Sequence, residues 1–197
     1  MIQSQHLCHP ENYLERAKHC LGQSEPEFLY YAALELRCFV EARQHQYLTA
    51  QRKYAKSMPR SWRIGQQGKE LKRIYDRQKI QRLRMIFQDN FEFEVRYVPV
   101  SEILRNNSEK LGKLLHAQED VQEQSHLEEM QALLSTTWEK ANHCQSGNLL
   151  APSLLDKSSG QPAGNLEAIV PNGESAELIR HMQEGAKMIV KVDYLEI

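Results

Sequence analysis

One long amphipathic pattern between Glu27 and Tyr54 constrains the fold of this chain more than any other feature. At about 100° per residue, its apolar positions fall on a single face of a helix. These positions are Phe28, Ala32, Leu36, Phe39, Val40, Tyr47, Ala50 and Tyr54. Arg43 falls among them, and Glu35 lies at the edge of the same face. The segment therefore predicts the central helix of a bundle, with a charged side chain inside its apolar stripe.

The charge within this stripe needs a partner. Because an unpaired charge is costly to bury, Arg43 and Glu35 are expected to be paired, hydrogen-bonded or functional. The planar guanidinium of an arginine suits the recognition of phosphate or carboxylate groups. The sequence leaves open whether Arg43 belongs to a functional site or only to an internal ion pair.

The remaining pattern predicts further helices and a small β element. Helical signals cover residues 10–22, 69–87, 102–142 and 175–183. The polar stretch 118–126 indicates a bend or a break in the third of these segments. Residues 91–98 alternate between apolar and polar side chains, as a strand does, and residues 187–195 form a second strand pattern. These two strands are expected to pair near one another, because a lone strand leaves its backbone groups unbonded.

The predicted fold class is mainly α, a helical bundle with a small β element formed near 91–98 and 187–195. Residues 1–142 are expected to form the bundle with one inserted strand, and residues 143–197 a loop with a small β/α appendage. The 197 residues, 41% of them hydrophobic and 26% charged, have the composition of a globular domain. The longest apolar run, 28–34, is too short to span a bilayer, so no membrane partner is expected. Because the cysteines form no CxxC pair, a reducing cytoplasmic location is expected.

Cationic residues are concentrated in one part of the chain. Although the formal net charge is −1, twelve of the 25 lysines and arginines lie between Arg52 and Arg84, against only Glu70 and Asp76. The candidate nucleic-acid contacts are Arg52, Lys53, Lys69, Lys72, Arg73 and Arg77. Clustered cations of this kind bind phosphates in a salt-dependent manner. The alternatives are a solvated helix face and docking against the acidic segment 119–139.

Two further groups of polar residues are candidates for chemistry. Arg37, Glu41 and His45 are spaced i, i+4 and i+8, so they line one helical face. Arg105 and His116 lie on a later helical segment. For both groups the alternative is structural, as a solvated strip or a hydrogen-bonded support. The histidines and cysteines near the N-terminus match no compact zinc module, so no metal or other cofactor is expected.

The run from Tyr30 to Ala42 resembles the core helix of HEPN-type helical domains, which occur in prokaryotic toxin and phage-defence proteins. The run from Leu111 to Ala117 is similar to a second helix of the same kind, and the resemblance covers about residues 25–118. It implies an all-helical bundle that often forms dimers. It also implies that catalytic members are metal-independent RNases. These members use an arginine and a histidine separated by four to six residues, which suits phosphate stabilisation and general acid–base chemistry.

The chain departs from this catalytic pattern, because no arginine is followed by a histidine at that spacing. Seven residues separate Arg37 from His45, and ten separate Arg105 from His116. The leading hypothesis is a HEPN-like module of a defence or toxin–antitoxin system that binds or cleaves RNA without metal. Its site would be assembled across subunits from Arg37, Glu41, Arg43, His45, Arg105 and His116.

The alternative hypothesis is a non-catalytic interaction subunit that dimerises through its bundle. It would dock an acidic protein or a nucleic acid through the basic region 52–84. The expected partners are therefore a second copy of the chain, RNA, and a protein encoded in the same defence operon. Whether the chain is an enzyme stays open from the sequence.

Overall fold

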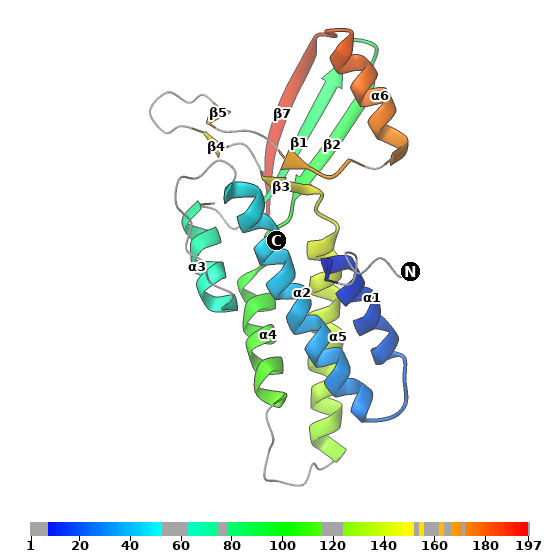
Figure 1. Ribbon diagram of the computed structural model, residues 1–197, viewed down its shortest axis with the longest axis vertical. Coiled ribbons are helices and arrows are strands. Elements are labelled where there is room, and N and C mark those ends of the chain that lie inside the picture. Colours follow the sequence, from blue (N-terminus) through cyan, green and yellow to red (C-terminus); the bar gives the residue numbers. More distant parts are fainter. Residues whose placement is uncertain are drawn as a thin grey trace.

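The computed structural model describes residues 8–52, 63–74, 79–115, 124–151, 154–155, 162–163, 167–170 and 172–196. Over these ranges the protein is a helical bundle with a small antiparallel sheet at one end (Figure 1). The predicted class, mainly α with a small β element, is confirmed at this level. None of the helices in the described ranges combines the length and the apolar character needed to cross a bilayer.

The body of the bundle consists of α1 (Pro10–Leu21), α2 (Glu27–Arg52), α4 (Glu102–Leu114) and α5 (Gln124–Gln145), with the shorter α3 (Ile64–Ile74) packed on α2 and α4. The α4 helix begins where the Ser101 hydroxyl accepts a hydrogen bond from the Leu104 amide, as expected of an N-cap. The helical signal over 102–142 is thus two helices, α4 and α5, in agreement with the break indicated by the polar stretch.

Helix α2 lies at the centre of the bundle and contacts α1, α3, α4 and α5. Its predicted apolar face is buried at Ala32, Leu36, Phe39, Val40, Tyr47 and Ala50. Phe28 is only partly buried, and Tyr54 lies outside the described residues. Since burying one large apolar side chain contributes about 1.5–3 kcal/mol, this face is a main source of stability.

A β-hairpin separates α3 from α4, and it corrects two predictions. Residues 80–87 form strand β1 (Ile80–Phe87) rather than the end of a helix, so the bundle carries two inserted strands and not one. Strand β2 (Glu92–Tyr97) pairs antiparallel with β1, as Figure 1 shows. The C-terminal strand β7 (Met188–Leu195) pairs with β1 and not directly with 91–98, which gives the order β2-β1-β7. Asn90 adopts a positive φ of 67° in the hairpin turn, a conformation that asparagine tolerates.

The two faces of this sheet differ in chemistry. One face buries Leu83, Phe87, Phe93, Val95 and Tyr97. Helix α6 (Asn172–Gln183) adds His181 to this face, where its ring stacks on Phe87 and on Phe91, each at 4.8 Å between centroids. The opposite face carries charged pairs, of which Arg82–Asp193 at 2.8 Å links β1 to β7.

Short strands occupy part of the segment predicted to be a loop. β3 (Leu149–Ala151) pairs with β6 (Glu167–Ala168), and β4 (Leu154–Leu155) pairs with β5 (Pro162–Ala163). Because β7 completes the sheet of the inserted hairpin, the C-terminal segment and the bundle insert share one sheet.

Candidate functional site

Arg43 is fully buried at the point where the bundle meets the sheet. Its Nη2 atom donates to the carbonyl of Cys144 at 3.3 Å and to the carbonyl of Gly147, and its Nη1 atom donates to Gln46 Oε1 at 2.7 Å. Cys144 lies in the last turn of α5 and Gly147 lies just beyond it. A cation bonded to the carbonyls at a helix C-terminus satisfies groups that the helix leaves unpaired. Arg43 therefore caps α5 from inside the protein.

Tyr47 and Gly147 complete this junction. The Tyr47 hydroxyl donates to the Val98 carbonyl at 2.7 Å, directly after β2, and the Arg43 guanidinium lies 4.6 Å from the centre of the Tyr47 ring. A Cβ atom added at Gly147 would lie 2.9 Å from the Val98 amide nitrogen, so only glycine fits without a shift. We call Arg43, Tyr47, Val98, Cys144 and Gly147 the junction cluster, since it joins α2, α5 and β2.

Burial controls the protonation of the junction cluster. It raises the pKa of Tyr47 well above its ordinary value, and it raises the pKa of the Cys144 thiol. Both side chains are therefore neutral near pH 7. The Cys144 thiol donates to the Val98 carbonyl at 3.6 Å, so it is a structural donor and not a thiolate nucleophile.

Arg37 and Glu41 form the more accessible part of the predicted catalytic set. Arg37 Nε donates to Glu41 Oε1 at 3.2 Å, and about a third of each side chain is exposed. The Arg37 guanidinium lies against Gly112 on α4, where an added Cβ would be 1.8 Å from Nη1. Gly112 thus provides the space for the arginine between α2 and α4. Glu35, the other charge near the apolar stripe, pairs with Arg16 of α1 at 2.9 Å.

The remaining catalytic candidates lie apart from this pair. His45 is exposed, and its Nε2 atom lies 3.4 Å from the Thr49 hydroxyl one turn further along α2. Arg105 on α4 donates from Nη1 to the Val100 carbonyl at 2.7 Å, and burial lowers the pKa of its guanidinium. His116 falls outside the described residues. In this chain, Arg43 and Arg105 are bonded to backbone carbonyls, and Arg37 is bonded to a carboxylate.

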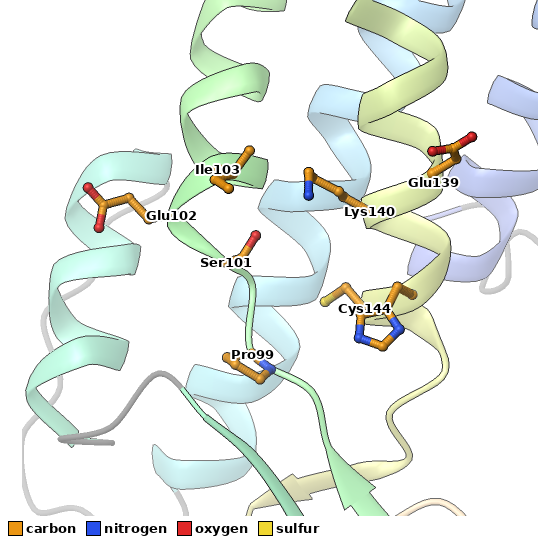
Figure 2. A pocket seen from close by; sticks show the side chains of 8 residues that line it. Pro99, Ser101, Glu102, Ile103, Glu139, Lys140 and Cys144 are labelled. Atoms are coloured by element: carbon orange, nitrogen blue, oxygen red, sulfur yellow. The ribbon is translucent and has the colours of Figure 1, made fainter. Parts of the chain in front are cut away.

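A pocket of about 450 Å³ lies between the start of α4 and the end of α5, and no sequence signal had indicated it. It is lined by Pro99, Ser101, Glu102, Ile103, Glu139, Lys140, His143 and Cys144. Figure 2 shows Ser101 and Ile103 on the α4 side and Lys140 and Cys144 on the α5 side. Its lining carries charges of both signs, while its hydroxyl and thiol are engaged in the α4 cap and the junction cluster. The pocket therefore presents no activated nucleophile.

The cations of the basic region divide between two elements. Lys69, Lys72 and Arg73 are exposed on α3. Arg82 and Arg84 lie in β1, where both bond to Asp193. Arg52 is the last residue of α2, and Lys53 and Arg77 lie outside the described residues. The α3 group thus forms an exposed cationic surface among the predicted nucleic-acid contacts whose side chains the structure describes.

Within the described ranges, no group of three or more histidine, cysteine, aspartate or glutamate side chains is arranged to hold a metal ion. Comparisons with protein-family models, with curated proteins and with solved structures gave no match. The resemblance to HEPN-type domains accordingly stays a prediction from the sequence.

Proposed function

We propose that this protein is a non-catalytic subunit that binds RNA through the outer face of α3. The observation that carries the proposal is the division of α3 into two faces. Ile64, Gln67, Gly68 and Leu71 are buried against the bundle. Lys69, Lys72 and Arg73 point away from it and lie within about one helical turn of one another.

The charge on this outer face suits a polyanion. Glu70 is the acidic residue of α3, and it pairs with Arg73 at 2.9 Å, while 69% of the Arg73 side chain stays exposed. Cations clustered on one helix face are the electrostatic footprint of phosphate binding. Because α3 packs mainly on α2 and α4, this face is directed away from the rest of the bundle and not toward the acidic residues of α5. RNA is the polyanion that the HEPN resemblance implies.

The positions of the candidate catalytic arginines support a binding function over a catalytic one. General acid–base chemistry needs an accessible base and a phosphate-stabilising cation near the same reacting atoms. Arg43 is fully buried in the junction cluster, and Arg105 donates a hydrogen bond to the Val100 carbonyl. Both arginines therefore support the fold.

A salt titration of RNA binding tests the proposal. In EDTA, the affinity of the full chain for a single-stranded RNA is measured against salt for wild type and for Lys69→Gln/Lys72→Gln/Arg73→Gln. Each lost phosphate contact lowers the log–log slope by about 0.7, so the triple variant is expected to lose about 2 in slope. The matched control is Lys110→Gln/Lys113→Gln, since both of these lysines are exposed on α4. Equal slopes for wild type and the triple variant would show that α3 is not the RNA surface.

The Arg37–Glu41 pair favours a second candidate, RNA cleavage without metal, because it keeps a guanidinium partly exposed. The same RNA is incubated with wild type, Arg37→Ala and the control Lys110→Ala, all in EDTA. Our proposal expects intact RNA in every sample. Cleavage by wild type and by Lys110→Ala, but not by folded Arg37→Ala, would replace the binding function with a catalytic one.

A further inference from the structure

We infer that β7 pairs with β7 of a second copy of this chain, which joins the two three-stranded sheets into one continuous antiparallel sheet. This pairing involves the sheet and not the α3 face that is proposed to bind RNA. In Figure 1, β7 is the outer strand of the sheet, and no other described strand pairs with its outer edge.

The two edges of the sheet differ in how far other parts of the chain cover them. On the β2 side, strand β3 lies alongside and the Arg96 amide donates to Asn148 Oδ1 at 2.8 Å, so the edge is partly covered. On the β7 side, apolar residues are exposed along the whole strand. They are Met188, Ile189, Val190, Val192, Tyr194 and Leu195. An edge strand of eight residues with apolar side chains on both faces is a template for pairing with another chain.

The sequence of β7 is complementary to itself when it is reversed about Val192. In an antiparallel pair centred on that residue, Lys191 lies opposite Asp193 of the partner subunit, and the two-fold axis repeats this pair. Val190 then faces Tyr194 of the partner subunit, and Ile189 faces Leu195 of the partner subunit. From residue 189 to residue 195, each apolar side chain therefore meets an apolar one and each charge meets its opposite, while Met188 lies opposite Glu196 just beyond the strand.

Neighbouring registers lack this match. In a continuous sheet, two residues that lie opposite each other point to the same face. A two-fold axis perpendicular to the sheet meets this condition only when it passes between two copies of the same residue, so the pairing is centred on a residue. Centring it on residue 191 places two lysines opposite each other, and centring it on residue 193 does the same for two aspartates. Asp193 already accepts hydrogen bonds from Arg82 and Arg84, so a lysine from the second copy extends an existing ion network. These features identify a second copy as the occupant of this edge.

The oligomeric state of the full chain gives the first test. Sedimentation velocity over a range of protein concentrations is expected to show a dimer for wild type. In Lys191→Glu two attractive pairs become repulsive, so its dimer dissociation constant is expected to rise about tenfold or more. The control Lys113→Glu changes the same charge on α4 and is expected to leave the dimer unchanged. A wild-type chain that is monomeric at every concentration would overturn the inference, and the edge would then belong to a partner of different sequence.

Register-specific cross-linking gives the second test, and it needs Cys8→Ser as background because Cys8 is exposed. Val192→Cys is expected to form a disulfide-linked dimer, since the two positions meet at the axis. Val190→Cys alone is not expected to cross-link, because the two positions would be about 13 Å apart. A mixture of Val190→Cys with Tyr194→Cys is expected to cross-link. A wild-type dimer that Val192→Cys does not trap would overturn the proposed surface, and RNA binding would still be judged by the α3 variants.

Discussion

The junction cluster and strand β7 both depart from the usual rule that charged side chains are exposed and apolar side chains are buried. The junction cluster buries the charge of Arg43 completely, whereas β7 leaves Val192 44% exposed. The buried arginine is bonded to two backbone carbonyls and to a side-chain amide oxygen, which offset part of the cost of its burial, while its Nε atom has no hydrogen-bond partner among the described residues. The apolar residues of β7 have no such compensation within the described chain. An interior charge here indicates a structural joint, and an exterior apolar strand indicates a binding edge.

The largest expected effect concerns the buried charge. Arg43→Met removes the donor to the carbonyls of Cys144 and Gly147; the Cys144 carbonyl keeps the Gly147 amide at 3.3 Å, and the Gly147 carbonyl loses its side-chain donor. We expect the free energy of unfolding, measured in urea at neutral pH, to fall by about 3 kcal/mol. The control Arg37→Met breaks a partly exposed i,i+4 pair and is expected to cost about 0.5 kcal/mol. Similar losses in the two variants would mean that Arg43 does not hold the junction cluster together.

The next effect concerns the close approach at Gly147. In Gly147→Ala, the new Cβ would meet the Val98 amide nitrogen at 2.9 Å and the Arg96 carbonyl oxygen at 3.1 Å. Because backbone atoms must move, we expect a loss of about 2 kcal/mol in unfolding free energy. Gly22→Ala is the matched control, since its Cβ would meet its nearest atom at an ordinary 3.5 Å. A neutral Gly147→Ala would contradict the packing of β2 against the end of α5.

A smaller effect compares two valines that flank Leu83 on the same face of the sheet. Val95 on β2 is fully buried, whereas Val192 on β7 is exposed. Val95→Thr buries a hydroxyl and is expected to cost about 1.5 kcal/mol, while Val192→Thr is expected to stay within about 0.5 kcal/mol. Thermal unfolding at low protein concentration measures both for the monomer. Equal costs would show that β7 is covered within one chain.

The effect that is smallest near neutral pH is a dependence of stability on pH. Burial raises the pKa of Tyr47 and of Cys144, so the folded state favours their neutral forms. Their stabilisation is fully present below the ordinary pKa values, about 8.5 for cysteine and 10 for tyrosine, and is lost as pH rises through the folded values. We expect the unfolding free energy to decline by about 1.4 kcal/mol per pH unit for each group in the alkaline range. Cys144→Ala is expected to flatten the decline just above pH 9, and an unchanged slope would contradict the burial of that thiol.

The sequence predicted the elements in which apolar residues recur at a regular helical or strand spacing. The apolar stripe of α2 identified the central helix, and the alternation at 91–98 identified β2. β1 was missed because Ile80, Leu83 and Ile86 are spaced three residues apart and imitate a helix. Asp89 and Asn90, between Phe87 and Phe91, favour a tight turn, and this turn places residues 80–87 in a hairpin strand despite their helix-like spacing.

The site was less accessible to sequence reasoning. The pattern singled out Arg43 as unusual, but its partners Cys144 and Gly147 are more than a hundred residues away, and backbone carbonyls leave no sequence signal. The pocket between α4 and α5 likewise depends on how two helices pack. The exposed cations of α3 were predicted individually, because charge and helical spacing are local properties.

We infer that the buried Arg43 stabilises the fold and that the exposed cations of α3 bind RNA. RNA affinity of the folded Arg43→Lys variant tests it most directly, because lysine keeps the charge but cannot reproduce the guanidinium contacts. We expect reduced stability with an unchanged RNA affinity and salt slope per folded molecule. A folded Arg43→Lys variant that no longer binds RNA, while its α3 face is intact, would contradict it.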